Sequence, residues 1–399
     1  MANSFRHSNP IGLSNGHIVT GWTDTTVVGD RAEVRAQIYT SAGARIGNVI
    51  AVNTQTSDQQ QEPAAAPLAN GGFVFVWADS YALEEPDPTL SLPATPADDF
   101  GGVRAQVFDA NGVKSGSEIR VNTSLPGLQR GATVAGLVNG NFVVTWQDSD
   151  GDSDDDAVKA QMFNAAGVAI GTEFLVNTNT TSFQTRPAIS ALTGGGFVIV
   201  WHDNSQTLGD TSRLSVKAQL FDAAANRIGG EFLVNTTTAE QQWFATVTGL
   251  SGGGFAVTWE DTSLMGGDAS IGSVKAQVFT ATGTKIGAEF LVNTNTMGNQ
   301  FSPSIAALPD NAFVITWQDN SQTLGDTAVS IIKAQVFTGM GAKSGDEFLV
   351  NTPSADTKIY PFASPLATGG FVIAWKEFSG ILLDPASSEK TKARVYTPT

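Results

Sequence analysis

The chain has 399 residues, 41% of them hydrophobic, with no Cys and a formal net charge of −16. This hydrophobic content suffices for a packed core, which excludes a disordered chain, and the missing cysteines exclude disulfides and thiolate metal sites. The acidic excess makes nucleic acid a poor partner and cations better ones. No apolar stretch reaches the roughly 20 residues of a membrane span, and the N-terminus has no apolar core. We therefore expect neither membrane insertion nor an N-terminal signal peptide.

Three motifs recur along the whole chain. An apolar run of the form GFVVTW ends at a framework tryptophan, a KAQVF-like run carries a landmark glutamine, and a VNT triplet follows it. From the landmark glutamine to the next framework tryptophan the distance is always 40 residues, and to the asparagine of VNT it is always 16. Length therefore varies only between tryptophan and glutamine, as expected for a fixed core that carries one variable loop. The framework tryptophans are Trp22, Trp77, Trp146, Trp201, Trp259, Trp317 and Trp375.

One repeat shows the elements that we expect in every copy. Residues 302–310 alternate weakly and are rich in small side chains, and residues 311–317 form a dense β-branched and aromatic run. Residues 330–337 alternate apolar and polar side chains, and residues 347–352 form a short last strand. Turn signals separate these segments, and no segment has a 3.6-residue period. Each repeat thus predicts four antiparallel strands and almost no helix.

Seven such units predict an all-β, seven-bladed β-propeller with four-stranded antiparallel blades. We expect one domain over residues 1–399 and a monomeric ring, with an open solenoid as the alternative. After the last landmark position too few residues remain for a fourth strand, so the last blade should lack its outer strand unless residues 1–6 pair there. The expected blades span residues 7–54, 55–123, 124–178, 179–236, 237–294, 295–352 and 353–399.

The GGFVVTW-like strands, KAQxF runs and EFLVNT strands resemble repeats of large secreted bacterial surface proteins. These are RTX-type, calcium-associated adhesins and hemolysin-like proteins, chiefly of alphaproteobacteria. The resemblance implies an extracellular or cell-surface location, export without an N-terminal signal, and calcium-rich surroundings. The glycine- and aspartate-rich nonapeptide that binds calcium in such proteins is absent here, so the motif itself does not carry calcium binding over.

Most of the acidic residues lie in the variable hairpins between the second and third strands. An acid follows each framework tryptophan by two residues, and a second acid, often in Gly-Asp, comes later. Two identical loops, DNSQTLGDT at 203–211 and at 319–327, contain the pairs Asp203 with Asp210 and Asp319 with Asp326. Carboxylate and carbonyl oxygens are what a hard cation prefers, so these pairs are candidate calcium ligands. Alternatively, the first aspartate only caps the strand and Gly-Asp only makes a turn.

The stretch DSDGDSDDD at 148–156 is the strongest cation signal, because its carboxylates repel one another at neutral pH. It is not an EF-hand, since Asp155 stands at position 6 and Gln161 at position 12. A solvated acidic loop is the alternative to a calcium site. A second unusual hairpin, the proline-rich insertion at 84–99, should protrude. The candidate calcium ligands of the first stretch are Asp148, Asp150, Asp152, Asp154 and Asp156.

The sequence singles out no catalytic residue. The three histidines fall at unrelated repeat positions, and no phosphate loop, dinucleotide fingerprint or nucleophile elbow appears. Candidate ligand-binding residues lie in the connections that lead into each repeat. Trp243 could stack on a sugar or pack under a neighbouring hairpin, and three glutamines could line the mouth of the channel or bond the turn. These glutamines are Gln184, Gln242 and Gln300.

We therefore expect a non-catalytic extracellular binding or adhesion module that presents acidic, calcium-binding hairpins on one face. A glycan or a cell-surface protein would be its partner. The alternatives are a carbohydrate-active enzyme, a glycoside hydrolase or lyase that uses carboxylates of this face, and an inert spacer of a larger surface protein.

Overall fold

The structure is a computed structural model that describes residues 9–26, 32–56, 59–80, 101–124, 127–152, 154–268, 270–379 and 388–397. The insertion at 84–99 and the alternative pairing of residues 1–6, both considered above, lie outside this described part. The chain forms two compact units, Met1–Ala188 and Ile189–Thr399, and the boundary between them lies within one strand.

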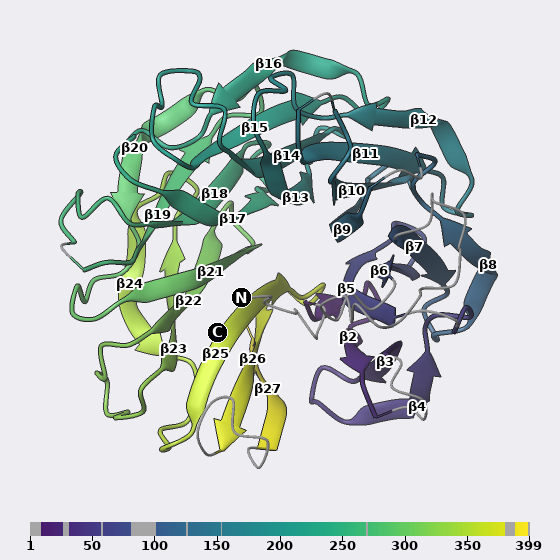
Figure 1. Cartoon of the computed structure of the whole chain (residues 1–399). Coiled ribbons are helices and arrows are strands. Elements are labelled where there is room, and N and C mark those ends of the chain that lie inside the picture. Colours follow the sequence, from purple (N-terminus) through teal and green to yellow (C-terminus); the bar gives the residue numbers. More distant parts are fainter. Residues whose placement is uncertain are drawn as a thin grey trace, which may run out of the picture. The chain divides into compact units, whose positions relative to one another are not determined.

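The first unit contains three antiparallel sheets, here called blades 1 to 3 (Figure 1). In chain order their strands are β1 (Ile11–Gly12), β2 (Ile18–Asp24), β3 (Glu33–Tyr39) and β4 (Arg45–Ala51); β5 (Gln59–Pro67), β6 (Phe73–Ser80), β7 (Gly101–Phe108) and β8 (Lys114–Arg120); and β9 (Gln129–Gly136), β10 (Phe142–Asp148), β11 (Ala157–Phe163) and β12 (Ala169–Leu175).

Blades 4 to 7 follow, and the division between the units falls inside the first strand of blade 4. Their strands are β13 (Gln184–Ala191), β14 (Phe197–Asp203), β15 (Ser215–Phe221) and β16 (Arg227–Leu233); β17 (Gln242–Gly249), β18 (Phe255–Asp261), β19 (Ser273–Phe279) and β20 (Lys285–Leu291); β21 (Gln300–Ala307), β22 (Phe313–Asp319), β23 (Ile331–Phe337) and β24 (Lys343–Leu349); and β25 (Thr357–Pro365), β26 (Phe371–Ser379) and β27 (Ser388–Tyr396).

The second strand of each blade forms the core. Every residue of β10, β14, β18 and β22 is buried, as their continuous apolar and aromatic sequences require of strands covered on both faces. Five of the framework tryptophans are fully buried, namely Trp77, Trp146, Trp201, Trp259 and Trp317. Trp77, Trp146 and Trp317 pack in apolar clusters that also contain residues of the preceding blade, so these side chains belong to the core and are not exposed to ligands.

Glycine is required where a blade turns from its first to its second strand. A Cβ on Gly196 would lie 2.2 Å from the carbonyl oxygen of Phe221, and one on Gly254 would lie 2.2 Å from that of Phe279. Any larger residue would therefore push the second strand away from the third.

The architecture is an all-β seven-bladed propeller with four-stranded antiparallel blades and three strands in the last blade, and the described residues contain no helix. The predicted fold class is thereby confirmed. Within each unit, the first strand of a blade packs on the blade before it, as β9 does on β5 and β21 on β17. The fourth strand lies at the opposite edge of its sheet, and its residues are half-buried or exposed.

Candidate functional site

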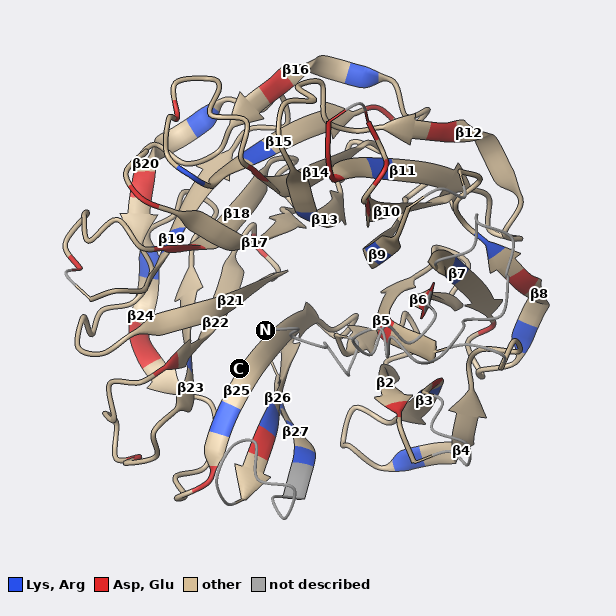
Figure 2. Cartoon of the chain, in the orientation of Figure 1, with Lys and Arg blue, Asp and Glu red and all other residues tan. Residues whose placement is uncertain are grey.

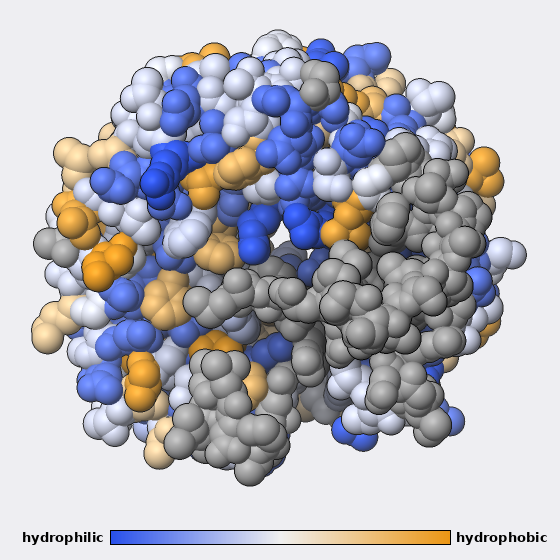
Figure 3. Space-filling model, in the orientation of Figure 1, coloured by the Kyte–Doolittle hydropathy of each residue, from blue (hydrophilic) through white to orange (hydrophobic). Residues whose placement is uncertain are grey.

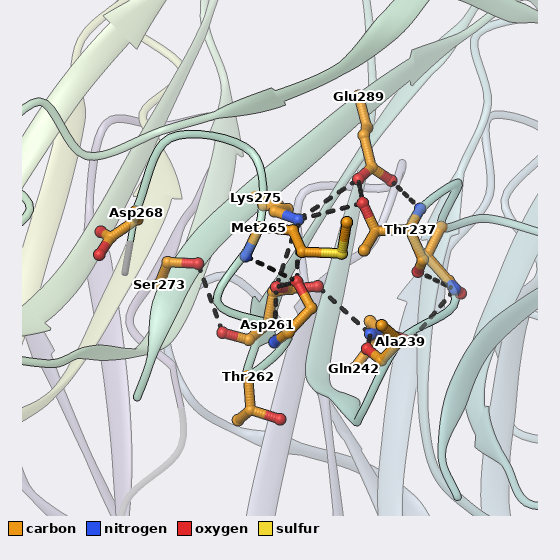
Figure 4. A network of polar contacts seen from close by, with 12 residues as sticks. Thr237, Ala239, Gln242, Asp261, Thr262, Met265, Asp268, Ser273, Lys275 and Glu289 are labelled. Carbon is orange, nitrogen blue, oxygen red and sulfur yellow. Dashed lines mark hydrogen bonds and ion pairs between the residues drawn. The ribbon is translucent and has the colours of Figure 1, made fainter. Parts of the chain in front are cut away.

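A basic residue two positions before the landmark glutamine lies between two acids in most blades. In blade 4, Lys217 on β15 places its Nζ 3.0 Å from Asp203 at the end of β14 and 3.2 Å from Glu231 on β16. Both the lysine and the aspartate side chains are fully buried. Blades 2, 3, 5 and 6 repeat the arrangement with Asp79, Arg104 and Glu118; Asp148, Lys159 and Glu173; Asp261, Lys275 and Glu289; and Asp319, Lys333 and Glu347. We call each set the ion-pair triad (blade 5 in Figure 4).

Hydroxyl groups complete the surroundings of the ammonium group in blade 4. Ser205 Oγ lies 2.8 Å and Thr207 Oγ1 2.6 Å from Lys217 Nζ, in addition to the two carboxylates. Oxygen atoms from four side chains therefore surround the positive charge, much as they would surround a bound cation. The lysine neutralises the acidic hairpin from within the chain.

In blades 4, 5 and 6 the second acid of the hairpin binds the asparagine of the VNT triplet. Asn235 donates from Nδ2 to Asp210 at 2.8 Å and to Gln242 Oε1 at 3.1 Å, while its Oδ1 accepts the Val216 N–H at 2.9 Å. Asn293 makes the corresponding bond to Asp268 at 2.7 Å. In these three blades the hairpin and the connection to the next blade are therefore joined at one end of the sheet.

Charge and hydrogen bonding keep the second acid of blade 6 ionised. Burial raises the pKa of Asp326, but the Ala328 N–H, the Lys358 ammonium and the Asn351 amide outweigh it, so that the pKa lies below its usual value. Lys358 Nζ and Asn351 Nδ2 lie 3.0 and 2.7 Å from the carboxylate.

The third acid of the triad ties its blade to the preceding one. Glu289 accepts the N–H groups of Thr236 at 2.5 Å and Thr237 at 3.0 Å, and Glu347 accepts that of Thr294 at 2.7 Å. Burial raises the pKa of Glu289, but the hydrogen bonds from Thr237 and Thr236 and the charge of Lys275 lower it below its usual value. Figure 2 shows these acids in red on the fourth strands β12, β16, β20 and β24.

The structure gives most of the predicted calcium ligands partners within the chain. Asp148, Asp203 and Asp319 belong to ion-pair triads, and Asp210 and Asp326 bind VNT asparagines. The other four aspartates of the acidic stretch differ in their surroundings. Asp152 binds Asn177 at 3.2 Å, Asp154 accepts the Ser182 N–H at 2.6 Å, Asp156 lies 3.7 Å from Arg130, and Asp150 is exposed.

Among the described residues, no three His, Cys, Asp or Glu side chains are grouped as metal ligands. Calcium binding thus stays a prediction.

The predicted ligand-binding glutamines face the protein interior. Gln184, Gln242 and Gln300 are fully buried. Each accepts a hydrogen bond from the VNT asparagine before it and donates to a carbonyl oxygen of its own connection, as Gln300 does to Met297 at 3.0 Å. Trp243, the fourth candidate, is half-buried at the start of β17.

A β-bulge interrupts the first strand near its start in blades 2, 3, 5, 6 and 7. In blade 5 the register with β18 shifts between Trp243 and Thr246, and Phe244 has a φ of 51°. Ser302, at the same place in blade 6, also has a φ of 51°. Bulges of this kind redirect side chains and are frequent beside active sites. The left-handed conformation is uncommon for such residues, which makes the bulges candidate functional positions.

In blades 3, 4 and 5 the residue directly after the framework tryptophan accepts a hydrogen bond from the bulge region of the following blade, and we call this repeat position the clamp position. Gln147 accepts the Arg186 N–H at 3.4 Å, His202 accepts the Ala245 N–H at 3.1 Å, and Glu260 accepts the Ser302 N–H at 3.4 Å. Elsewhere the residue type differs again. The seven residues in chain order are Thr23, Ala78, Gln147, His202, Glu260, Gln318 and Lys376.

Glu260 is the clamp residue with the most unusual electrostatics. It is 7% exposed, and its Cα pairs with that of Trp243 on the neighbouring strand. Burial raises its pKa to about 7, against the smaller opposite effects of the Trp243 side chain and the Ser302 N–H. A carboxyl group with this pKa exchanges its proton near neutral pH, as general acid–base chemistry requires.

Glu260 was not among the residues predicted from the sequence, although the sequence contains a signal for its position. The second-strand positions before the framework tryptophan carry only apolar residues, Gly or Thr, whereas the clamp position changes from amide to imidazole to carboxylate to amine. A repeat position that varies in chemistry while its neighbours stay fixed marks the place where the copies differ in role.

The outer surface of the hairpins in blades 4 to 6 is apolar as well as polar. Their aspartates are buried, whereas Leu208, Leu264 and Leu324 are 50, 54 and 49% exposed. Figure 3 shows exposed hydrophobic side chains as separate spots on a mainly hydrophilic face.

No protein-family profile and no curated protein sequence matches this chain. Its fold is similar to that of several solved propellers. A PL25 ulvan lyase is 9% identical with a TM-score of 0.56, covering 99% of this chain and 96% of its own. The α-L-arabinofuranosidase Arb93A of Fusarium graminearum is 12% identical with a TM-score of 0.52, covering 84 and 94%. A protein of unknown function from Dyadobacter fermentans is 14% identical with a TM-score of 0.52, covering 80 and 91%.

These findings correct the expectation that the chain is not an enzyme. Several of the similar propellers, with TM-scores of 0.50 to 0.56, are structures of an arabinofuranosidase and a polysaccharide lyase, and none of these structures is that of an adhesin. At such low identity the likeness establishes the fold alone, so the activity must be argued from this chain's own residues. No helix among the described residues is long and apolar enough to cross a membrane.

Proposed function

We propose that the protein is a carbohydrate-active enzyme that cleaves glycosidic bonds of a polysaccharide, with Glu260 as the proton-transferring residue and Trp243 as the sugar platform. The observation that carries the proposal is a buried carboxyl group with a pKa of about 7 directly across the strand pair from a half-buried tryptophan. A carbohydrate-active enzyme was the alternative function predicted from the sequence, and the proposal now names the carboxyl group involved.

The clamp role by itself does not require a carboxyl group at this position. Gln147 makes the same contact to the next bulge in blade 3, and Gln318 occupies the position in blade 6. A neutral amide would satisfy the Ser302 N–H without the cost of burying a charge. The glutamate is therefore better explained by chemistry than by folding.

Glu260 would act on the oxygen atom that links two sugars. In its protonated form it donates the proton to this oxygen as the bond between the oxygen and the sugar carbon breaks, and the leaving sugar departs as a neutral alcohol. A water molecule forms the new bond to that carbon, and the proton that this water releases restores the Glu260 carboxyl group. The indole face of Trp243 would stack on an apolar sugar face and place the linkage beside the carboxyl group. The extracellular location implied by the family resemblance stays a prediction, and it would suit an enzyme of this class.

The test compares the wild-type protein with Glu260→Gln on arabinan and on ulvan, the polymers related to the two named neighbours, and on a wider polysaccharide panel. Glutamine occurs at this position in two other blades, so the variant should fold. We expect cleavage to fall by about 10²- to 10⁴-fold, the usual contribution of a general acid or base, while binding in affinity gel electrophoresis is retained.

Trp243→Ala is the companion variant and should lose binding. Gln147→Ala, at the same position of blade 3, is the matched control and should retain cleavage. Full activity of Glu260→Gln, or no cleavage of any polysaccharide by the wild-type protein, would contradict the proposal.

A further inference from the structure

The junction between blades 4 and 5 is built differently from the comparable junctions. At the residue after the bulge, Pro63, Pro187, Pro303 and Pro361 have no N–H to donate. Blade 3 has Ala132 and blade 5 has Ala245 at this place. The Ala245 N–H is bonded to the imidazole of His202, whereas the clamp residue that precedes blade 3 is Ala78, whose side chain has no hydrogen-bond acceptor. At the junctions that follow Gln147 and Glu260, the clamp residue instead binds the bulged residue itself.

His202 makes a second contact at the same bulge. Its ring lies 6.3 Å from the Phe244 ring in an edge-on arrangement, and Phe244 lies 5.4 Å from the Trp243 ring. The histidine is only 3% exposed, so these groups hold it within the protein. A continuous series of contacts thus runs from His202 through Phe244 to Trp243, which lies opposite Glu260.

We propose that His202 is a positioning residue, which fixes the bulge of β17 so that the Trp243 indole lies where a sugar binds beside Glu260. It fixes the backbone on one side of Phe244 through the Ala245 N–H and the Phe244 ring through packing. Glutamine, as found in blade 3, would supply a hydrogen-bond acceptor without the ring contact. The enzymatic part of this inference rests on the function proposed above, whereas its structural part does not.

The decisive variant is His202→Gln combined with Ala245→Pro, which recreates the Gln147 and Pro187 pair of the preceding junction. Because this pair already occurs in the fold, the variant should melt within a few degrees of the wild-type protein. We expect its KM for the cleaved polysaccharide to rise about tenfold with kcat within about twofold, because the loss concerns binding of the sugar and not proton transfer. An unchanged KM would overturn the inference.

A spectroscopic measurement tests the structural part without activity. In protein labelled with 5-fluorotryptophan, the Trp243 fluorine resonance is identified by its loss in Trp243→Phe. This resonance should shift in His202→Ala and in the double variant, and it should stay in place in Gln147→Ala. An unshifted resonance in both His202 variants would overturn the inference. A shifted resonance in a protein that cleaves no polysaccharide would overturn the proposed function and retain His202 as the residue that positions Trp243.

Discussion

Two adjacent positions at the end of the second strand behave in opposite ways along this chain. The residue two after the framework tryptophan is an acid in every blade, and in blades 2 to 6 it belongs to a buried ion-pair triad. The residue one before it, at the clamp position, changes chemistry from blade to blade. Successive strand residues point to opposite faces. One face of the strand therefore carries the constant acid that stabilises the blade, and the other carries the clamp residue, which differs between blades.

The largest effect is expected from a change on the strand face that carries the constant acid. Lys217→Ala would leave Asp203 and Glu231 buried without their cation, and it should lower the free energy of unfolding by about 3–5 kcal/mol. Urea unfolding followed by circular dichroism measures the change. The matched control is Lys392→Ala in blade 7, where the lysine side chain is 49% exposed and lies 3.7 Å from Glu377. Exposed pairs contribute about 0–1 kcal/mol, so equal effects of the two changes would refute the distinction.

The second effect concerns the clamp face and depends on pH. The pKa of Glu260 is about 7 in the folded protein against 4.5 ordinarily, so the native state binds more protons between these values and loses stability as pH rises through them. Glu260→Gln should therefore match the wild-type protein at pH 4 and exceed its unfolding free energy by about 3 kcal/mol at pH 8.5. Unfolding curves at the two pH values measure this difference. A variant that is equally or less stable at pH 8.5 would show that Glu260 serves the fold.

The smallest effect concerns the bond between neighbouring blades. Glu289→Gln should cost about 2 kcal/mol at pH 7, because the charged acceptor of the Thr236 and Thr237 N–H groups is lost. The folded pKa of Glu289 is lowered, so its contribution is complete above pH 4.5 and disappears as pH falls through the folded value. Thermal melts from pH 7 to pH 3 should therefore converge for variant and wild type. A gap that persists at pH 3 would argue for packing and not charge.

The blade count, the strand order and the buried tryptophans followed from the sequence because they depend on local pattern and constant spacing. The same kind of spacing would have revealed part of the network. Lys217 and Glu231 are 14 residues apart, Asp210 and Asn235 are 25 apart, and both separations recur in other blades. The hairpin acids were interpreted as cation ligands because the sequence does not show that the lysine on the next strand reaches them.

The raised pKa of Glu260 could not be predicted, because it comes from the burial of the side chain, and the contact with Ser302 depends on the fold of the following blade. The bulge at Ser302 arises from a left-handed backbone at a serine, for which the residue type gives no warning. The alanine at 245, where four other blades have proline, was visible in the sequence, but its meaning required the His202 imidazole that binds its N–H.

The tethered ammonium of Lys217 has a practical consequence for how this protein matures. A counter-ion that belongs to the polypeptide cannot be diluted away or removed by a chelating buffer, and it arrives in the hairpin of blade 4 as that blade is synthesised. Folding of this hairpin therefore does not require the capture of a cation from the surroundings.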